Sequence, residues 1–128
     1  MFGANLYLPV VVSLDYDPAA DDDVIVYKAP FGCEIASAYI TTANAVGADT
    51  ANYFDLALYN NGTAGTAISN AISGTVGGTA GFVALSPVAF TISDGVLDAG
   101  ECVMLRYNEA GTGSFAQMTL QLNILPGQ

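Results

Sequence analysis

The sequence predicts an all-β protein that forms a single-domain antiparallel β-sandwich with jelly-roll topology. The chain has 128 residues, of which 52% are hydrophobic and only 11% are charged, and this length and composition suit one domain with a substantial core. Gly, Ala and Thr are frequent, whereas Glu, Lys and Arg are rare, so long surface helices are not expected. Apolar residues instead alternate with polar ones at a period of two, which is typical of half-buried strands.

Two segments show this alternation most clearly, and each is predicted to be a half-buried strand. In residues 117–125, the side chains expected to face the core are Met118, Leu120, Leu122 and Ile124. In residues 53–60, they are Phe54, Leu56 and Leu58. Asn60-Asn61-Gly62 closes the second segment, and Asn and Gly tolerate the positive φ of tight turns. This strand is therefore expected to end at Asn60.

Six further strands are predicted from apolar runs bounded by turn residues. They are Leu6–Leu14, Asp23–Lys28, Cys33–Thr42, Gly81–Leu85, Val88–Ile92 and Glu101–Tyr107. Separators such as Pro30-Phe31-Gly32 and Asp98-Ala99-Gly100 carry the chemistry of tight turns. Residues 60–81 are expected to be a long exposed loop or a weak edge strand, and residues 44–52 and 108–114 are expected to be connections. Eight short strands at this spacing favour a jelly roll.

The first 23 residues differ in pattern from the rest of the chain. Residues 1–23 are predicted to be an N-terminal strand or arm with an acidic loop, and residues 24–128 the β-sandwich, within one structural domain overall. The apolar opening has no basic start and leads directly into Asp15 and Asp17, so a signal peptide is not expected. No run approaches the roughly 18 apolar residues of a spanning helix, so no membrane anchor is expected.

The charge balance excludes two classes of partner. Twelve acids oppose only Lys28 and Arg106, which gives a net charge of −10. Nucleic acids require clustered Lys and Arg, and anionic membranes attract polybasic segments, so neither partner is expected. The mean hydropathy of +0.46 favours burial of apolar surface in a core or against other chains. Self-association or docking onto another protein is the expected consequence.

The chain offers little chemistry for a catalytic site. It contains no His, so the usual near-neutral base, the commonest zinc ligand and every His-dependent triad are missing. Its acids fall in turns and lack the combination of a buried acid and an aromatic platform that a glycosidase site would show. No catalytic residue, cofactor or metal is therefore predicted, and the protein is not expected to be an enzyme.

Three groups of residues keep two interpretations each. Cys33 and Cys102 are expected to be buried reduced thiols rather than a disulfide, although their pairing stays open. The acidic run from Asp15 to Asp23 is expected to be a solvated turn, with a Ca²⁺-binding loop as the alternative. The seven Tyr residues mark either a binding surface or the polar boundary of the sandwich, and both interpretations are equally supported.

Four segments resemble those of small phage virion proteins that coat capsids. They are residues 26–30 (VYKAP), 33–40 (CEIASAYI), 52–62 (NYFDLALYNNG) and 97–105 (LDAGECVML). Their order and spacing carry the resemblance, which covers residues 24–125.

This resemblance implies a capsid decoration protein, also called an auxiliary head or cement protein. Such a protein is made in the host cytoplasm and binds the major capsid protein on the exterior of the virion. It often binds as a homotrimer, it stabilises neighbouring capsomers, and the resemblance supplies no catalytic residues. The alternatives are a phage fibre or tail component and a carbohydrate-binding adhesive jelly roll.

Residues 1–23 fall outside this resemblance and have two interpretations. They form either the first strand of the sandwich, which is slightly favoured, or an arm that reaches a capsid or a neighbouring subunit. The apolar contact residues of such an arm would be Phe2, Leu6, Tyr7 and Leu8.

Overall fold

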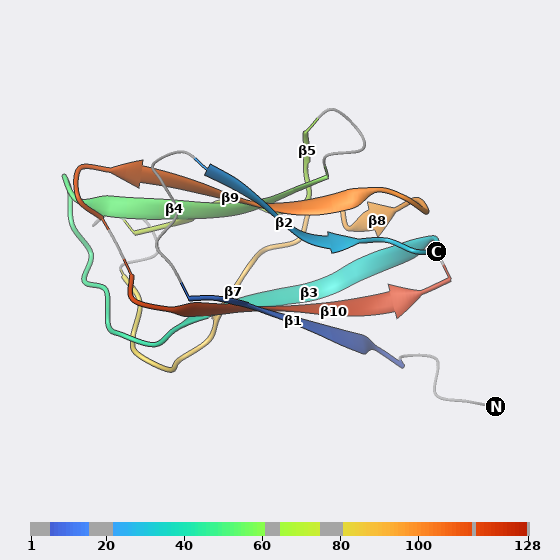
Figure 1. The fold of residues 1–128 in the computed structure, drawn as a ribbon, viewed down its shortest axis with the longest axis horizontal. Helices are drawn as coiled ribbons and strands as arrows, with labels where there is room; N and C mark the ends of the chain where they lie inside the picture. The colour runs from blue at the N-terminus through green and yellow to red at the C-terminus, as the bar shows by residue number, and fades with distance from the viewer. Residues whose placement is uncertain (1–5, 16–21, 61–64, 75–80, 114, 128) are drawn as a thin grey trace.

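The computed structural model describes residues 6–15, 22–60, 65–74, 81–113 and 115–127. Within these ranges the chain forms ten β-strands and no helix. The strands make two antiparallel sheets that lie one above the other (Figure 1). The predicted all-β class and the antiparallel β-sandwich are therefore confirmed. In the same residues, no helix is long and apolar enough to cross a membrane.

Each sheet contains three long strands and two short ones. The strands of sheet A, in order across the sheet, are β1 (Leu8–Leu14), β10 (Met118–Pro126), β3 (Cys33–Thr42) and β7 (Val88–Ala89), with β8 (Val96–Leu97) also paired to β3. The strands of sheet B are β2 (Asp22–Lys28), β9 (Cys102–Ala110), β4 (Tyr53–Asn60) and β5 (Thr66–Ala67), with β6 (Ile72–Ser73) also paired to β4.

The connections between the sheets follow the predicted jelly roll. The chain changes sheet after each of β1, β2 and β3, and again after β6, β8 and β9. The short strands β5 and β6 both pair with β4, and β7 and β8 both pair with β3, so each pair acts as one interrupted strand. Counted in this way, the sandwich has the eight strand positions of a jelly roll.

The core lies between the two inner faces, because apolar residues occupy every second position of the long strands. All the core residues predicted from residues 53–60 and 117–125 are buried, with at most 1% of their surface exposed. Four aromatic rings fill one end of this core, with neighbouring centroids 5.1–5.7 Å apart; they are Phe54, Phe82, Tyr107 and Phe115. The Tyr107 hydroxyl donates to the Gly113 carbonyl at 3.1 Å, so its polar atom is satisfied despite burial.

One predicted strand is wrong and another is shortened. In residues 81–85, Phe82 makes only an isolated bridge with Val46, and the chain then turns. Phe82 is buried, but Val83 and Leu85 are exposed. The run therefore lacks the alternate buried side chains that would hold a longer strand against the core. The strand predicted at Val88–Ile92 contracts to Val88–Ala89, because only these two residues pair with β3.

Other boundaries differ by a few residues. β9 continues to Ala110 because Asn108 and Glu109 still pair with β4, so polar side chains do not end this strand. The region 60–81, expected as a loop or a weak edge strand, contains β5 and β6, each of only two residues. Residues 8–14 form β1 and pair with β10, as the strand interpretation of the N-terminal segment expects.

Candidate functional site

The outer face of sheet A carries a continuous set of side chains without charge. Alternate residues of β1, β10, β3 and β7 point away from the core and lie opposite one another in the register of the sheet. They form three cross-strand rows: Pro9, Asn123 and Ser37; Val11, Gln121, Tyr39 and Ala89; and Ser13, Thr119 and Thr41. None of these residues is Asp, Glu, Lys, Arg or His. We call this set the neutral face.

Acids border the neutral face but do not enter it. Glu34 lies on β3 beyond the bulge between Asn123 and Ile124, opposite Leu125. Asp15 follows the last residue of β1, and its carboxylate accepts a hydrogen bond from Gln117 Nε2 at 2.9 Å. Glu34 is the only acid within the strands of sheet A. In a chain with a net charge of −10, the rows between these two acids are a distinct surface.

Hydrogen bonds hold the amide side chains of the neutral face in place. Asn123 Nδ2 donates to Ser37 Oγ at 2.8 Å, and Gln121 Nε2 donates to Asn123 Oδ1 at 2.9 Å. The chain of bonds links β10 to β3 on the side of the sheet away from the core. Because these groups are oriented before any partner arrives, less conformational entropy is lost when they make a contact.

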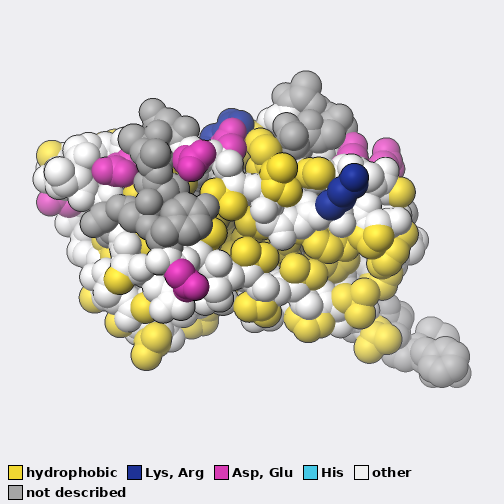
Figure 2. Space-filling model, in the orientation of Figure 1, with side chains coloured by type: hydrophobic (Ala, Val, Ile, Leu, Met, Phe, Trp, Pro, Cys, Tyr) yellow, Lys and Arg dark blue, Asp and Glu magenta, His cyan; other side chains and the backbone are white. Residues whose placement is uncertain are grey.

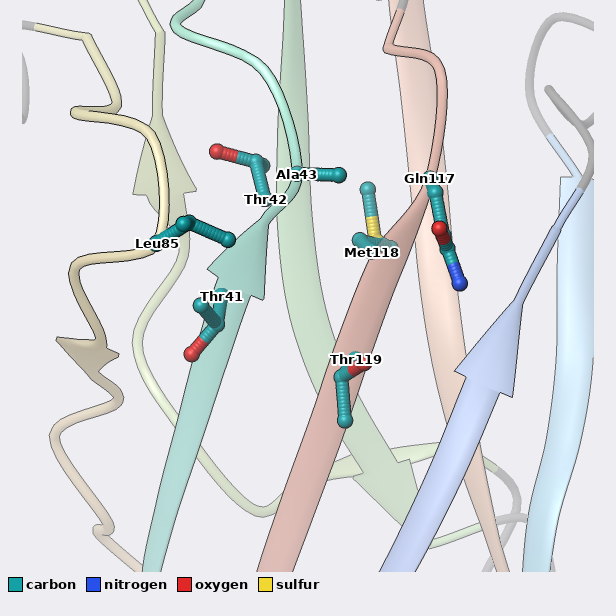
Figure 3. A pocket seen from close by; sticks show the side chains of 7 residues that line it. All are labelled: Thr41, Thr42, Ala43, Leu85, Gln117, Met118 and Thr119. Carbon is teal, nitrogen blue, oxygen red and sulfur yellow. The ribbon is translucent and has the colours of Figure 1, made fainter.

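Two adjoining depressions hollow one side of this face. The larger, of about 320 Å³, is lined by Tyr39, Thr41, Pro87, Thr119 and Gln121. The smaller, of about 210 Å³, is lined by Thr41, Thr42, Ala43, Leu85, Gln117, Met118 and Thr119 (Figure 3). The two depressions share Thr41 and Thr119, and no carboxylate, thiol or cation lines either of them.

Two unusual features meet at the smaller depression. Leu85 has a φ of 61°, a left-handed conformation that is uncommon for a residue other than glycine, and its side chain is 77% exposed. Its N–H donates to the Thr42 carbonyl at 2.8 Å. The Thr42 hydroxyl is buried and makes no hydrogen bond within the described part of the chain. Local strain and unsatisfied polar groups are both more frequent at functional surfaces than elsewhere.

The outer face of sheet B differs because it carries an ion pair. Arg106 Nε donates to Asp23 Oδ1 at 2.9 Å, and Nη2 donates to Oδ2 at 3.3 Å. The guanidinium carbon lies 4.0 Å from the centre of the Tyr59 ring, so the cation also contacts an aromatic face. The hydrogen bonds to Asp23 raise the pKa of Arg106. Most of the acids in view in Figure 2 lie over the half of the molecule formed by sheet B.

The neutral face can bind but offers little acid–base chemistry. Its hydroxyl and amide groups donate and accept hydrogen bonds and do not change protonation near neutral pH. Tyr39, Val11 and Pro87 add apolar surface between these groups. Such a mixture suits a protein surface or a neutral polyol rather than a charged ligand.

The apolar contact residues predicted near the N-terminus lie at the start of β1. Leu6, Tyr7 and Leu8 are exposed, with 75%, 43% and 45% of their surfaces accessible, and Leu8 is opposite Ile124 in sheet A. Phe2 lies outside the described residues. The three described side chains are therefore available to a partner, and they adjoin the neutral face through Pro9 and Val11.

Three acids of the acidic run lie in the described residues, with Asp15 directly after β1. Asp22 and Asp23 belong to β2, where Asp23 pairs with Arg106, while Asp17 and Asp21 lie outside the described residues. Within the described ranges, no group of three His, Cys, Asp or Glu side chains is placed to hold a metal ion. The Ca²⁺ alternative gains no support from Asp15, Asp22 and Asp23.

Both cysteines are free thiols. Cys33 is fully buried in β3, and Cys102 is half-buried in β9. Burial raises the pKa of the Cys33 thiol, and a hydrogen bond with Tyr27 lowers it by a smaller amount. Neither thiol lines the two depressions.

The neutral face was missed at the sequence level, although three of its ten residues were present in the pattern of one predicted strand. Thr119, Gln121 and Asn123 are the polar positions of the predicted strand 117–125, and all three lie on this face. Each of the three lies in a different row, and the other members of each row, such as Ser37 and Tyr39, come from segments far away in the chain. A count of charges on the outward positions of each predicted strand would have given the signal.

Comparisons with known proteins identify no relative. No family model, no curated protein and no solved structure matches the chain.

Proposed function

We propose that the protein is a structural virion protein that binds the outside of a phage capsid and cements neighbouring capsomers. In this proposal it contacts the major capsid protein, acts as a homotrimer and performs no catalysis. The observation that carries the proposal is the neutral face, an uncharged and hydrogen-bonding surface on a chain with twelve acids and two cations.

The distribution of charge supports this role on physical grounds. A carboxylate that is desolvated without a partner costs far more than a hydroxyl or an amide that finds a new hydrogen bond. The centre of a protein interface is accordingly depleted of charged residues. The neutral face is therefore the surface of sheet A that can approach a shell at the lowest desolvation cost, while the Asp23–Arg106 pair of sheet B stays in water.

The fold also suits a molecule that clamps a shell. Each of the two sheets presents one broad outer face, and a shell-covering protein needs many copies and extended contacts rather than reactive groups. Leu6 and Tyr7 precede β1 and are exposed, so they add apolar surface to the proposed contact beyond the edge of the neutral face. Leu8 is exposed as well, but it shares its side of sheet A with the buried Ile124.

The test is the copy number of this chain in purified virus particles, measured by quantitative mass spectrometry against the major capsid protein. A ratio near one to one is expected for a protein that covers the shell. A handful of copies per particle would contradict decoration and favour a fibre or tail component. Absence from particles would remove the virion proposal altogether.

A second candidate function, binding of a neutral carbohydrate, is favoured by the larger depression alone. Tyr39 offers a ring on which a sugar could stack, and Thr41, Thr119 and Gln121 offer hydrogen-bonding groups around it. Isothermal titration with neutral glycans, with and without EDTA, tests this candidate. Saturable heat that Tyr39→Ala abolishes would support it, and no heat at millimolar glycan would remove it.

A further inference from the structure

The sandwich has four sheet edges, and three of them are protected against pairing with another chain. The edges on the side of β3 and β4 are formed by strands of two residues, β7, β8, β5 and β6, and such short strands offer little backbone to pair with. The β2 edge carries Asp22, Asp23 and Lys28 and has a bulge between Ile25 and Tyr27. Short strands, edge charges and bulges are the usual means of preventing edge-to-edge association.

The fourth edge, β1, has almost none of these features. Its seven residues, LPVVVSL, carry no charge, and all seven pair with β10 without a register shift. Pro9 is one protective residue, but it lies next to the start of the strand and leaves Val10–Leu14 unprotected. Of the described residues, only those of β10 pair with β1.

Apolar side chains continue along this side of the molecule. Val11 at the middle of β1 is 60% exposed, and Leu6, Tyr7 and Leu8 lead into the strand with large exposed fractions. Figure 2 shows hydrophobic side chains gathered on the side of the sandwich where β1 and β2 run. A long, uncharged and apolar edge in a sheet protein is a site for strand addition.

We infer that the β1 edge pairs with the β1 edge of a second copy of this chain. The occupant must be an extended, β-favouring strand without charge, because the β1 edge carries no ion that could pair with a charge buried against it. β1 meets this requirement, since it carries no charge and its three consecutive Val residues favour an extended strand. Two antiparallel copies would face each other across a two-fold axis, as in an isologous contact.

This pairing goes beyond the proposed function because it needs no capsid. A two-fold contact cannot close a trimer, so β1 pairing joins one homotrimer to the next rather than building it. Copies arranged over a shell would then be linked to their neighbours through continuous A sheets. The free protein would contain an even number of chains.

The experiment compares the mass of the free protein and of three lysine or glutamate variants by sedimentation equilibrium. Val11→Lys places a charge in the middle of β1, and Ile25→Lys is the matched control, because Ile25 is 63% exposed and lies in the protected edge strand β2. Ala89→Glu alters the neutral face at the opposite side of sheet A. Val11→Lys is expected to lower the mass at least twofold, and the other two variants are expected to keep the wild-type mass.

Three results would overturn the inference. They are a monomeric wild-type protein, a Val11→Lys variant with the wild-type mass, and dissociation by Ala89→Glu or Ile25→Lys as well, which would assign the contact to another surface. Ser13→Lys, at an exposed position of the same strand, repeats the test if Val11→Lys fails to fold by circular dichroism. The copy number in virus particles is measured independently, so the proposed function and this pairing can fail separately.

Discussion

The outer faces of the two sheets are built on the same backbone pattern, yet they differ in charge. In sheet A the outward positions of the central strands carry hydroxyls, amides and apolar groups, with Glu34 as the one charged residue at the border. In sheet B the corresponding positions include Asp23, Arg106 and Asp55. The inner faces of both sheets contribute to one apolar core. The jelly roll therefore constrains the inward positions of each strand, and the outward positions are free to differ with the surroundings of each face.

The largest expected effect comes from placing one carboxylate on each face in turn. Ala89 and Ala67 are matched positions, because each is an exposed Ala at the end of a two-residue strand, opposite Tyr39 in sheet A and Tyr59 in sheet B. Ala89→Glu is expected to weaken binding to capsids that lack the protein at least tenfold, since an unpaired charge in an interface costs several kcal/mol. Ala67→Glu is expected to bind within about twofold of wild type.

Co-sedimentation of each variant with purified capsids, at matched protein concentrations, measures this difference. A urea melt of each variant controls for folding. If Ala89→Glu and Ala67→Glu bind equally well, the neutral face does not contact the shell.

A smaller effect is expected when one polar side chain is removed from each face and the free energy of unfolding is measured. Asn123→Ala removes two hydrogen bonds between half-buried groups and is expected to lower the free energy of unfolding by about 1–2 kcal/mol. Arg106→Met removes an ion pair and a ring contact that are partly exposed to water, so the expected loss is about 1 kcal/mol or less.

Urea denaturation in low salt and in about 1 M NaCl tests this difference, because the Debye length at the higher concentration is about 3 Å. The loss caused by Arg106→Met should shrink in high salt, and the loss caused by Asn123→Ala should not. If the loss caused by Asn123→Ala shrank in high salt and the loss caused by Arg106→Met did not, the hydrogen bonds of Asn123 would not be the source of its contribution to stability.

The long strands were predictable from sequence because their alternation involves several residues in succession. Cys33–Thr42 and Tyr53–Asn60 have the predicted bounds, and Met118 to Ile124 point to the core as expected. The strands β5, β6 and β8 were not predicted, since two residues show no period and their pairing depends on β3 and β4. β7 was predicted within the longer run Val88–Ile92. The run Phe82 to Leu85 failed for the opposite reason: it is apolar throughout, but of its large side chains only Phe82 is buried.

The neutral face was only partly predictable for a related reason. A strand pattern shows which residues of one strand share a side, so Thr119, Gln121 and Asn123 could be grouped. It does not show which strands are neighbours, and the sandwich brings β10 between β1 and β3. The strain at Leu85 and the unsatisfied Thr42 hydroxyl depend on tertiary packing and leave no trace in the local sequence.

The smallest expected effect concerns the two thiols, one in each sheet. Cys33 is fully buried and Cys102 is half-buried, so iodoacetamide at pH 8 should alkylate Cys102 in the native protein while Cys33 reacts at least about tenfold more slowly. Peptide mass spectrometry with time measures the two rates, and the urea-unfolded protein is the control in which both should react alike. Equal rates in the native protein would contradict the buried position of Cys33.

The burial of Cys33 should also make the free energy of unfolding depend on pH. Burial raises the pKa of Cys33 in the folded state, whereas the unfolded thiol titrates near about 8.5. The neutral thiol therefore contributes its full stability below the unfolded pKa, and this contribution is lost as the pH rises through the folded pKa. The urea concentration at the midpoint of unfolding should therefore fall as the pH rises above about 8.5, and Cys33→Ala should reduce that fall. An equal fall in the wild-type protein and in Cys33→Ala would contradict the assignment to Cys33.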